Sequence, residues 1–136
     1  MTAPQPYLHF PGTTREALTF YHRVFGGELT LHTRTDFGLS NGVPDAIAHG
    51  VLDGPVSLFG ADAEPDHQSF SSSGLMFALL GAADEPTLRR WFRELSDGGT
   101  VVDDLQVRAW GASDGQVRDR YGMLWLIGFE PEGSGK

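Results

Sequence analysis

The sequence predicts an α+β protein built from two βαβββ halves, which together form a curved mixed sheet around a cleft with both helices outside. The main observation is an internal repeat of strand, helix, Gly-Gly, strand and hairpin. The second is the nearly continuous apolar run from Met123 to Phe129, typical of a strand covered on both faces. A βαβββ unit cannot bury its own sheet face alone, so we expect the halves to share one sheet.

The first half covers residues 6–60. We expect Thr13 to cap the first helix in a capping box with Glu16, because a hydroxyl and a carboxylate at this spacing can satisfy two free N–H groups. The Gly26-Gly27 pair ends that helix, and Asp53-Gly54 joins the last two strands in a hairpin. The expected strands are residues 6–10, 28–35, 47–52 and 56–59.

A polar linker, residues 61–73, separates the halves, and its composition predicts a mobile segment outside the core. The second half covers residues 74–130, with Asp84 as the helix cap and Gly98-Gly99 as the helix stop. Its closing hairpin turns at Asp119–Gly122, where Asp opens and Gly closes a type I turn. We expect residues 1–136 to form a single domain with a frayed tail, residues 131–136.

Composition excludes several classes of function. The chain has no cysteine, so it has no disulfide, thiolate chemistry or Cys-ligated zinc. The net charge of −8 disfavours nucleic acid and anionic membranes, which require basic surfaces. No apolar run is long enough to cross a bilayer and the first residues show no signal-peptide pattern, so we expect a cytoplasmic protein.

Several motifs within the repeat resemble the vicinal-oxygen-chelate superfamily, which includes glyoxalase I, bleomycin-resistance proteins and extradiol dioxygenases. They are Tyr7-Leu8-His9-Phe10, residues 15–21, Val24-Phe25-Gly26-Gly27, Trp110-Gly111 and residues 115–125. The chain is most similar to the PhnB-like branch. The resemblance implies the glyoxalase-like fold, a small-molecule ligand in the cleft and a homodimer.

Catalytic members of this superfamily bind one divalent metal through side chains on the first and fourth strands of each half. Mapping by turns and helices puts these positions near Pro6 or Tyr7 and at Leu58, Phe77 and Leu126. Apolar side chains cannot coordinate a metal, so we expect no conventional metal centre and no cofactor. We expect Leu58, Phe77 and Leu126 to converge instead on the floor of the cleft.

The candidate ligand-binding residues combine that floor with histidines and aromatic side chains. They are His9, His49, Leu58, Phe77, Trp110, Trp125 and Leu126. A structural role is equally open for His9, and burial in the core is an alternative for Trp125. We expect His22, His32 and His67 to be solvated. No Ser-His-Asp grouping is visible, so no catalytic residue is assigned.

Two functions remain open. The first is metal-independent binding of a small organic molecule, aromatic or cationic, in the cleft. The alternative is a metal-dependent lyase, isomerase or dioxygenase with a metal held in a different place by His9, His49 or Glu130. The sequence does not decide whether the protein is an enzyme, and a structural role also remains open.

Overall fold

The computed structural model describes residues 3–40, 42–64, 68–71 and 73–131. The chain divides into two compact units, Met1–Phe70 and Ser71–Lys136, and the boundary lies inside the predicted linker. Most of the predicted tail, residues 132–136, lies outside the described residues. Neither helix in the described part of the chain is long and apolar enough to span a membrane.

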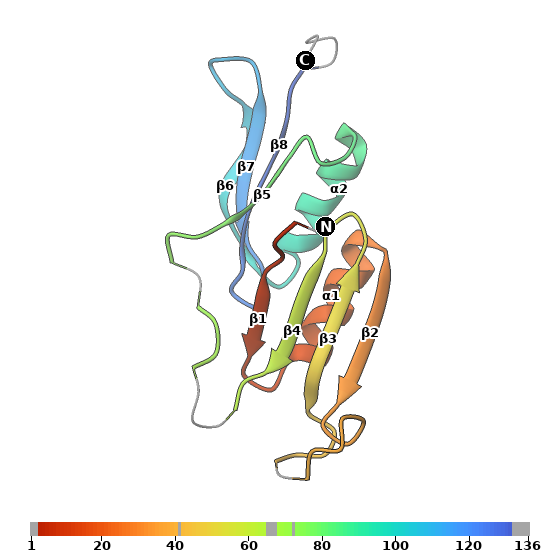
Figure 1. Cartoon of the computed structure of the whole chain (residues 1–136). Helices are drawn as coiled ribbons and strands as arrows, with labels where there is room; N and C mark the ends of the chain where they lie inside the picture. Colours follow the sequence, from red (N-terminus) through yellow and green to blue (C-terminus); the bar gives the residue numbers. More distant parts are fainter. Residues whose placement is uncertain (1–2, 41, 65–67, 72, 132–136) are drawn as a thin grey trace. The chain divides into compact units, whose positions relative to one another are not determined.

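The first unit is a four-stranded mixed sheet with one helix. Along the chain its elements are β1 (Tyr7–Phe10), α1 (Thr14–Phe25), β2 (Glu28–Thr33), β3 (Ile47–Asp53) and β4 (Leu58–Asp62). The order in the sheet is β1-β4-β3-β2, with β1 parallel to β4 and the other neighbours antiparallel. Helix α1 covers one face of this sheet (Figure 1).

The second unit repeats this topology. Its elements are β5 (Phe77–Leu80), α2 (Glu85–Ser96), β6 (Thr100–Val107), β7 (Ser113–Arg118) and β8 (Leu124–Phe129), with the sheet order β5-β8-β7-β6. The α+β class and the two βαβββ halves are therefore confirmed. Hydrogen bonds, however, define two sheets rather than the single curved sheet that we expected. In each half the last strand inserts beside the first, so the strands find partners within their own half.

The start of α1 differs from the prediction. The Thr13 side chain makes no capping hydrogen bond, so the expected capping box does not form. Instead, the carboxylate of Asp62 accepts hydrogen bonds from the backbone N–H groups of Thr14, at 3.0 Å, and Ile47, at 2.8 Å. Asp62 thus ties α1 and β3 to the end of β4. Helix α2 follows the prediction, since Asp84 accepts a hydrogen bond from the Thr87 N–H at 3.0 Å.

The two glycines of each Gly-Gly pair have different roles. The first, Gly26 or Gly98, has a φ of +79°, which L side chains rarely adopt, and Gly27 also has a positive φ, +96°. The second lies against the following hairpin: a Cβ on Gly27 would lie 2.5 Å from the carbonyl oxygen of Asp53, and one on Gly99 would collide with the carbonyl oxygen of Arg118. Both pairs therefore end a helix and also allow close contact between backbones.

The predicted turn of the closing hairpin forms around Asp119. The Gly122 N–H donates to the Asp119 carbonyl oxygen at 2.9 Å. The Asp119 carboxylate, itself buried, accepts from the backbone N–H groups of Tyr121 and Met123 and from Nε1 of Trp125. This side chain joins the turn to the aromatic core of the second unit.

The predicted linker begins too early. Strand β4 continues to Asp62, and Ala61 is buried, because β4 keeps its parallel pairing with β1 through His9 and Phe10. After the loop, the Phe70 N–H donates to the His9 carbonyl oxygen at 2.7 Å, and the Phe70 ring meets Phe10 edge to face. The ends of this segment therefore pack on the first unit, while residues 65–67 and 72 lie outside the described residues.

Candidate functional site

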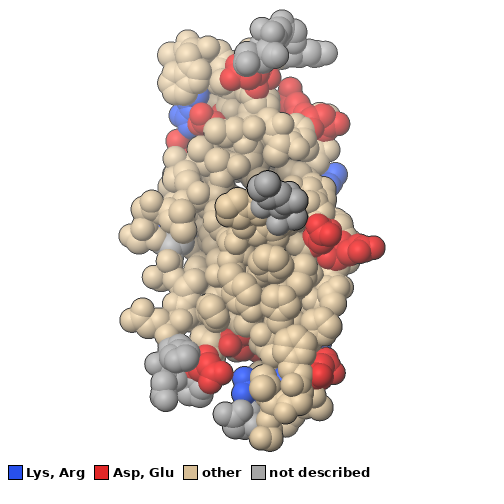
Figure 2. Space-filling view, in the orientation of Figure 1, with Lys and Arg blue, Asp and Glu red and all other residues tan. Residues whose placement is uncertain are grey.

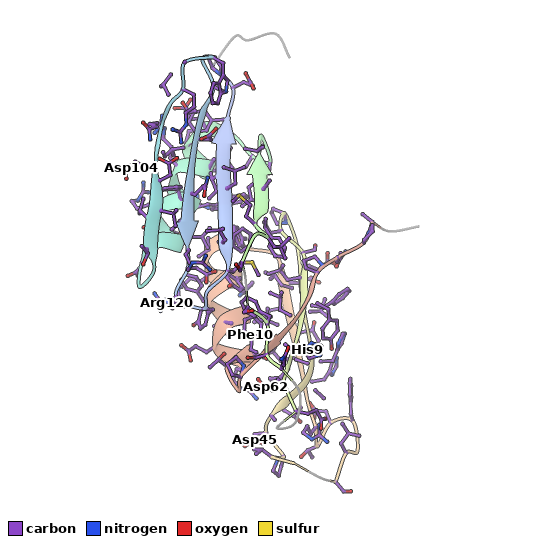
Figure 3. All side chains as sticks on the ribbon, turned by 90° about the vertical axis from the view of Figure 1, so that its left-hand side faces the viewer. His9, Phe10, Asp45, Asp62, Asp104 and Arg120 are labelled. Atoms are coloured by element: carbon purple, nitrogen blue, oxygen red, sulfur yellow. The ribbon has the colours of Figure 1, made fainter. Side chains whose placement is uncertain are left out.

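The two faces of the first sheet are distinguished by its contacts with α1. A Cβ added to Gly50 or Gly60 would lie 2.6 Å or 3.4 Å from Leu18 Cδ1, so both positions face the helix. Because side chains alternate along a strand, their neighbours face the other side, which we call the open face. Figure 3 shows His9 and Phe10 pointing to opposite sides of β1.

Four aromatic side chains gather on the open face, and we call them the open-face cluster: Tyr7, His9, His49 and Phe59. The ring centroid of Tyr7 lies 5.2 Å from that of His9, 5.6 Å from that of His49 and 5.9 Å from that of Phe59. The His49 and Phe59 rings are stacked at 5.6 Å. Three strands, β1, β4 and β3, therefore contribute to one surface of π-systems.

A hydrogen bond orders the polar atoms of this cluster. The Tyr7 hydroxyl oxygen lies 2.9 Å from Nδ1 of His49. Burial raises the pKa of the Tyr7 phenol, so the hydroxyl keeps its proton at neutral pH and is able to donate. When Nδ1 accepts this bond, the neutral His49 ring carries its own proton on Nε2. The pair then presents an N–H donor beside apolar ring faces.

The strands that carry the cluster have few charged side chains and no cationic ones other than histidine. The four strands of the first sheet contain no Lys or Arg. Asp62 points to the α1 side, where it binds the Thr14 N–H, and Glu28 and Asp53 lie at the paired ends of β2 and β3. Figure 2 shows this face in the lower half of the view, with an uncharged middle and charged side chains toward its edges. The site therefore suits an aromatic ligand without an anionic group.

The second sheet separates the candidates that we expected to converge. Phe77 pairs with Trp125, and their rings meet edge to face at 5.3 Å. The Arg89 side chain of α2 lies over the Phe129 ring, so Phe129 is on the side of β8 that faces the helix. The fully buried Ile127, two residues earlier, and Trp125, two residues before that, are on the same side. Leu126 pairs with Ala78 and points to the opposite side. The predicted convergence of Phe77 and Leu126 is therefore wrong.

The same alternation applies to Leu58, which is on the α1 side of its strand and 1% exposed. The turns and helices placed the mapped positions on the correct strands, but Leu58 and Phe77 point to the helix side and only Leu126 points away from it. The next residue along each strand, Phe59 after Leu58 and Ala78 after Phe77, faces away from the helix. Neither has an atom that can ligate a metal, but the mapped side chains do not share one face, so the expectation built on Leu58, Phe77 and Leu126 loses its main support.

The two candidate tryptophans have opposite environments. Trp125 is fully buried, and its Nε1 donates to the Asp119 carboxylate at 2.9 Å, so it is a core residue of the second unit. Trp110 lies in the turn between β6 and β7 and is 73% exposed. Neither indole belongs to the open-face cluster.

The metal implied by the superfamily does not fit the residues present. His9 and His49 share the open face, but Nδ1 of His49 is engaged with Tyr7. Glu130 follows β8 in the second unit. Within the described residues, no group of three or more His, Cys, Asp or Glu side chains is able to hold a metal ion. A usable divalent site requires about three protein ligands.

Tyr7 and Phe59 belong to this surface although neither is among the predicted ligand-binding residues. The alternation of aromatic side chains, Tyr7 and His9 in β1 and Phe59 in β4, is the sequence signal for their shared face. Two of the histidines that we expected to be solvated have contacts in the structure. His32 is half-buried and stacks on Phe37, and Nε2 of His22 lies 3.0 Å from the Gly27 carbonyl oxygen. His67 is outside the described residues.

Comparison with known proteins supports the resemblance. Residues 7–127 match the family model described as Glyoxalase/Bleomycin resistance protein/Dioxygenase superfamily. The chain is 30% identical to protein YjdN of Escherichia coli, over 90% of this chain and 91% of that protein. It is 31% identical to protein PA1353 of Pseudomonas aeruginosa, whose crystal structure matches with a TM-score of 0.79 over 96% of this chain and 98% of that one.

A third match has lower identity. A Bacillus cereus structure described as a putative 3-demethylubiquinone-9 3-methyltransferase, PhnB protein, gives a TM-score of 0.74 at 17% identity, covering 94% of this chain and 99% of that one, and shows a shared fold. The family match covers most of the chain, and its residues include both βαβββ halves except for the last two residues of β8. The chain therefore belongs to the glyoxalase/bleomycin resistance protein/dioxygenase superfamily.

Proposed function

We propose that this protein binds a small aromatic molecule on the open face of the first sheet, without the divalent metal used by catalytic members of the superfamily. The observation that carries the proposal is the open-face cluster. The Tyr7 ring lies within 6 Å of the other three rings, which come from β1, β3 and β4, and Tyr7 is 42% exposed. Aromatic side chains of this kind offer a large apolar contact area at a low cost in conformational entropy.

The polar atoms of the cluster support the same function. The Tyr7–His49 hydrogen bond holds two rings in a defined orientation, so less entropy is lost when a ligand binds. A ring nitrogen or hydroxyl of the ligand could pair with Nε2 of His49 while its ring stacks on Phe59. No covalent step follows from these residues, and we propose binding rather than catalysis.

The proposal is tested with indole as a single-ring-system probe. In a ¹H–¹⁵N NMR titration of EDTA-treated protein, we expect saturable shifts at the amides of Tyr7, His49 and Phe59, with a dissociation constant on the order of 1 mM for so small a ligand. Phe59→Leu removes the ring but keeps an apolar side chain of similar reach. It should weaken indole binding roughly fivefold, the loss of about 1 kcal/mol of ring contact.

The matched control is Leu80→Ala, which shortens an exposed apolar side chain on the open side of β5. This variant should bind indole as the parent protein does. Equal affinities of the parent and Phe59→Leu proteins for indole would overturn the proposal. Weaker indole binding in Leu80→Ala, with no weakening in Phe59→Leu, would also overturn it. Indole binding that disappears after EDTA treatment and returns with Zn²⁺, Ni²⁺, Fe²⁺ or Mn²⁺ would instead favour the metal-dependent alternative.

The homodimer stays a prediction from the superfamily resemblance. We propose that the protein associates through sheet edges, since exposed strands are commonly covered in oligomers. Sedimentation velocity at low micromolar concentration should show a species of twice the 14.8 kDa chain mass. A single monomeric species at that concentration would contradict it.

A further inference from the structure

A second aromatic pair lies at the β2 end of the first sheet. The imidazole of His32 stacks on the ring of Phe37, with centroids 5.1 Å apart and planes inclined by 24°. Phe37 belongs to the loop after β2 and is 50% exposed, although it is a large apolar side chain. We call these two rings the β2-edge stack.

The loop that carries Phe37 is held by hydrogen bonds. The Thr33 N–H donates to the Asp36 carboxylate at 2.9 Å, and the Asp36 N–H donates to the Thr33 hydroxyl oxygen at 3.0 Å. The backbone hydrogen bond from Thr33 is the main cause that lowers the pKa of Asp36, so the carboxylate stays charged and keeps this turn closed. The Phe37 N–H itself donates to the carbonyl oxygens of Thr33 and Arg34. An exposed aromatic ring on such a closed turn is preorganised for contact.

The β2-edge stack continues the open-face cluster across the sheet. His32 pairs directly with His49 in the antiparallel β2–β3 ladder, so the two imidazoles lie on the same face of neighbouring strands. Tyr7 and Phe59 contact His49 from the other side. Rings from all four strands and the β2 loop thus form one band. Three strand spacings correspond to a width of about 14 Å, which is longer than one aromatic ring.

The charges bordering the band favour a cation. Strands β1 to β4 contain no Lys or Arg, Asp36 lies one residue from Phe37, and the whole chain has a net charge of −8. Arg34, the nearest cationic residue of the loop, is paired with Glu64 at 3.4 Å. The faces of Tyr, Phe and neutral His rings attract a delocalised positive charge. A cation gains this attraction to the ring faces, whereas an anion does not.

We infer that the β2-edge stack is a second subsite of the same surface and that the ligand is an extended planar aromatic cation, long enough to contact both Phe59 and Phe37. This inference rests on the proposed function. It adds the chemical class of the ligand and assigns a specificity role to Phe37 and His32. A single-ring ligand needs only the open-face cluster.

The test compares two cationic probes, benzylamine with one ring and proflavine with three fused rings, in the full-length chain. Phe37→Ala should weaken proflavine binding about tenfold and leave benzylamine binding within about twofold, because only the longer probe reaches the β2-edge stack. Val43→Ala is the matched control, since Val43 is an exposed apolar residue of the same loop without a ring, and it should change neither affinity. Anthracene-2-sulfonate, a three-ring anion, should bind at least tenfold more weakly than proflavine.

The outcomes separate the inference from the proposed function. If Phe37→Ala and Val43→Ala bind proflavine as the parent does while Phe59→Leu weakens both cationic probes, the second subsite is overturned and the open-face cluster stands. If Phe59→Leu also has no effect, both proposals fail and proflavine binds only through general attraction to an acidic surface. Equal binding of the anion and proflavine would overturn the assignment of a cationic ligand.

Discussion

Replacing Asp119 by alanine should lower the free energy of unfolding by about 3–5 kcal/mol, because three donors then lose a charged acceptor in a buried place. The donors are the backbone N–H groups of Tyr121 and Met123, at 2.8 and 3.1 Å, and Nε1 of Trp125, at 2.9 Å. Asp119 is 3% exposed and Trp125 fully buried, so water cannot replace the lost bonds without opening the core.

A graded pair of variants identifies the cause. In Asp119→Asn, Oδ1 can still accept from the two backbone N–H groups, but the side-chain amide presents a donor to Nε1 of Trp125, so we expect roughly half the loss. Urea unfolding followed by tryptophan fluorescence measures both values. Asp104→Ala removes the same charge from an exposed strand residue, labelled in Figure 3, and should change the free energy of unfolding by less than about 0.5 kcal/mol. A loss below 1 kcal/mol in Asp119→Ala would contradict this account.

Replacing Asp62 by alanine should be nearly as destabilising, and asparagine should restore the lost stability only in part. The two carboxylate oxygens accept from different elements, Oδ1 from the Thr14 N–H and Oδ2 from the Ile47 N–H. An amide has one acceptor and would place its NH₂ group against the other N–H. We therefore expect Asp62→Ala to lower the free energy of unfolding by about 3 kcal/mol, and Asp62→Asn, which keeps one of the two bonds, to lower it by a smaller amount of at least about 1 kcal/mol.

Hydrogen exchange locates the effect of Asp62. The amides of Thr14 and Ile47 should both lose protection in Asp62→Ala, and at least one of them should lose it in Asp62→Asn, because the single amide oxygen cannot accept from both. Asp45→Ala, in an exposed loop of the same unit, should leave both amides protected. If Asp62→Asn were as stable as the parent protein, Asp62 would not be the common anchor of α1 and β3.

Local sequence signals were sufficient for the elements of the fold. The end of α1 follows from the Gly26-Gly27 stop, and Asp84 caps α2 as its position predicts. Asp119 and Gly122 form the predicted turn, because the hydrogen bond between them closes a turn of only four residues. These features depend on neighbours within one turn of chain, which the sequence shows directly.

The sequence by itself determined the repeat and the family resemblance. Only the tertiary structure decided which side chains share a face. Leu58 and Phe59 are adjacent in the chain, yet one packs under α1 and the other joins the open-face cluster. Strand pairing and the position of the helix set this choice, and a shift of one residue exchanges the two faces. The cap of α1 by Asp62, 48 residues away from Thr14, and the proximity of Tyr7 to His49 depend on the same long-range pairing.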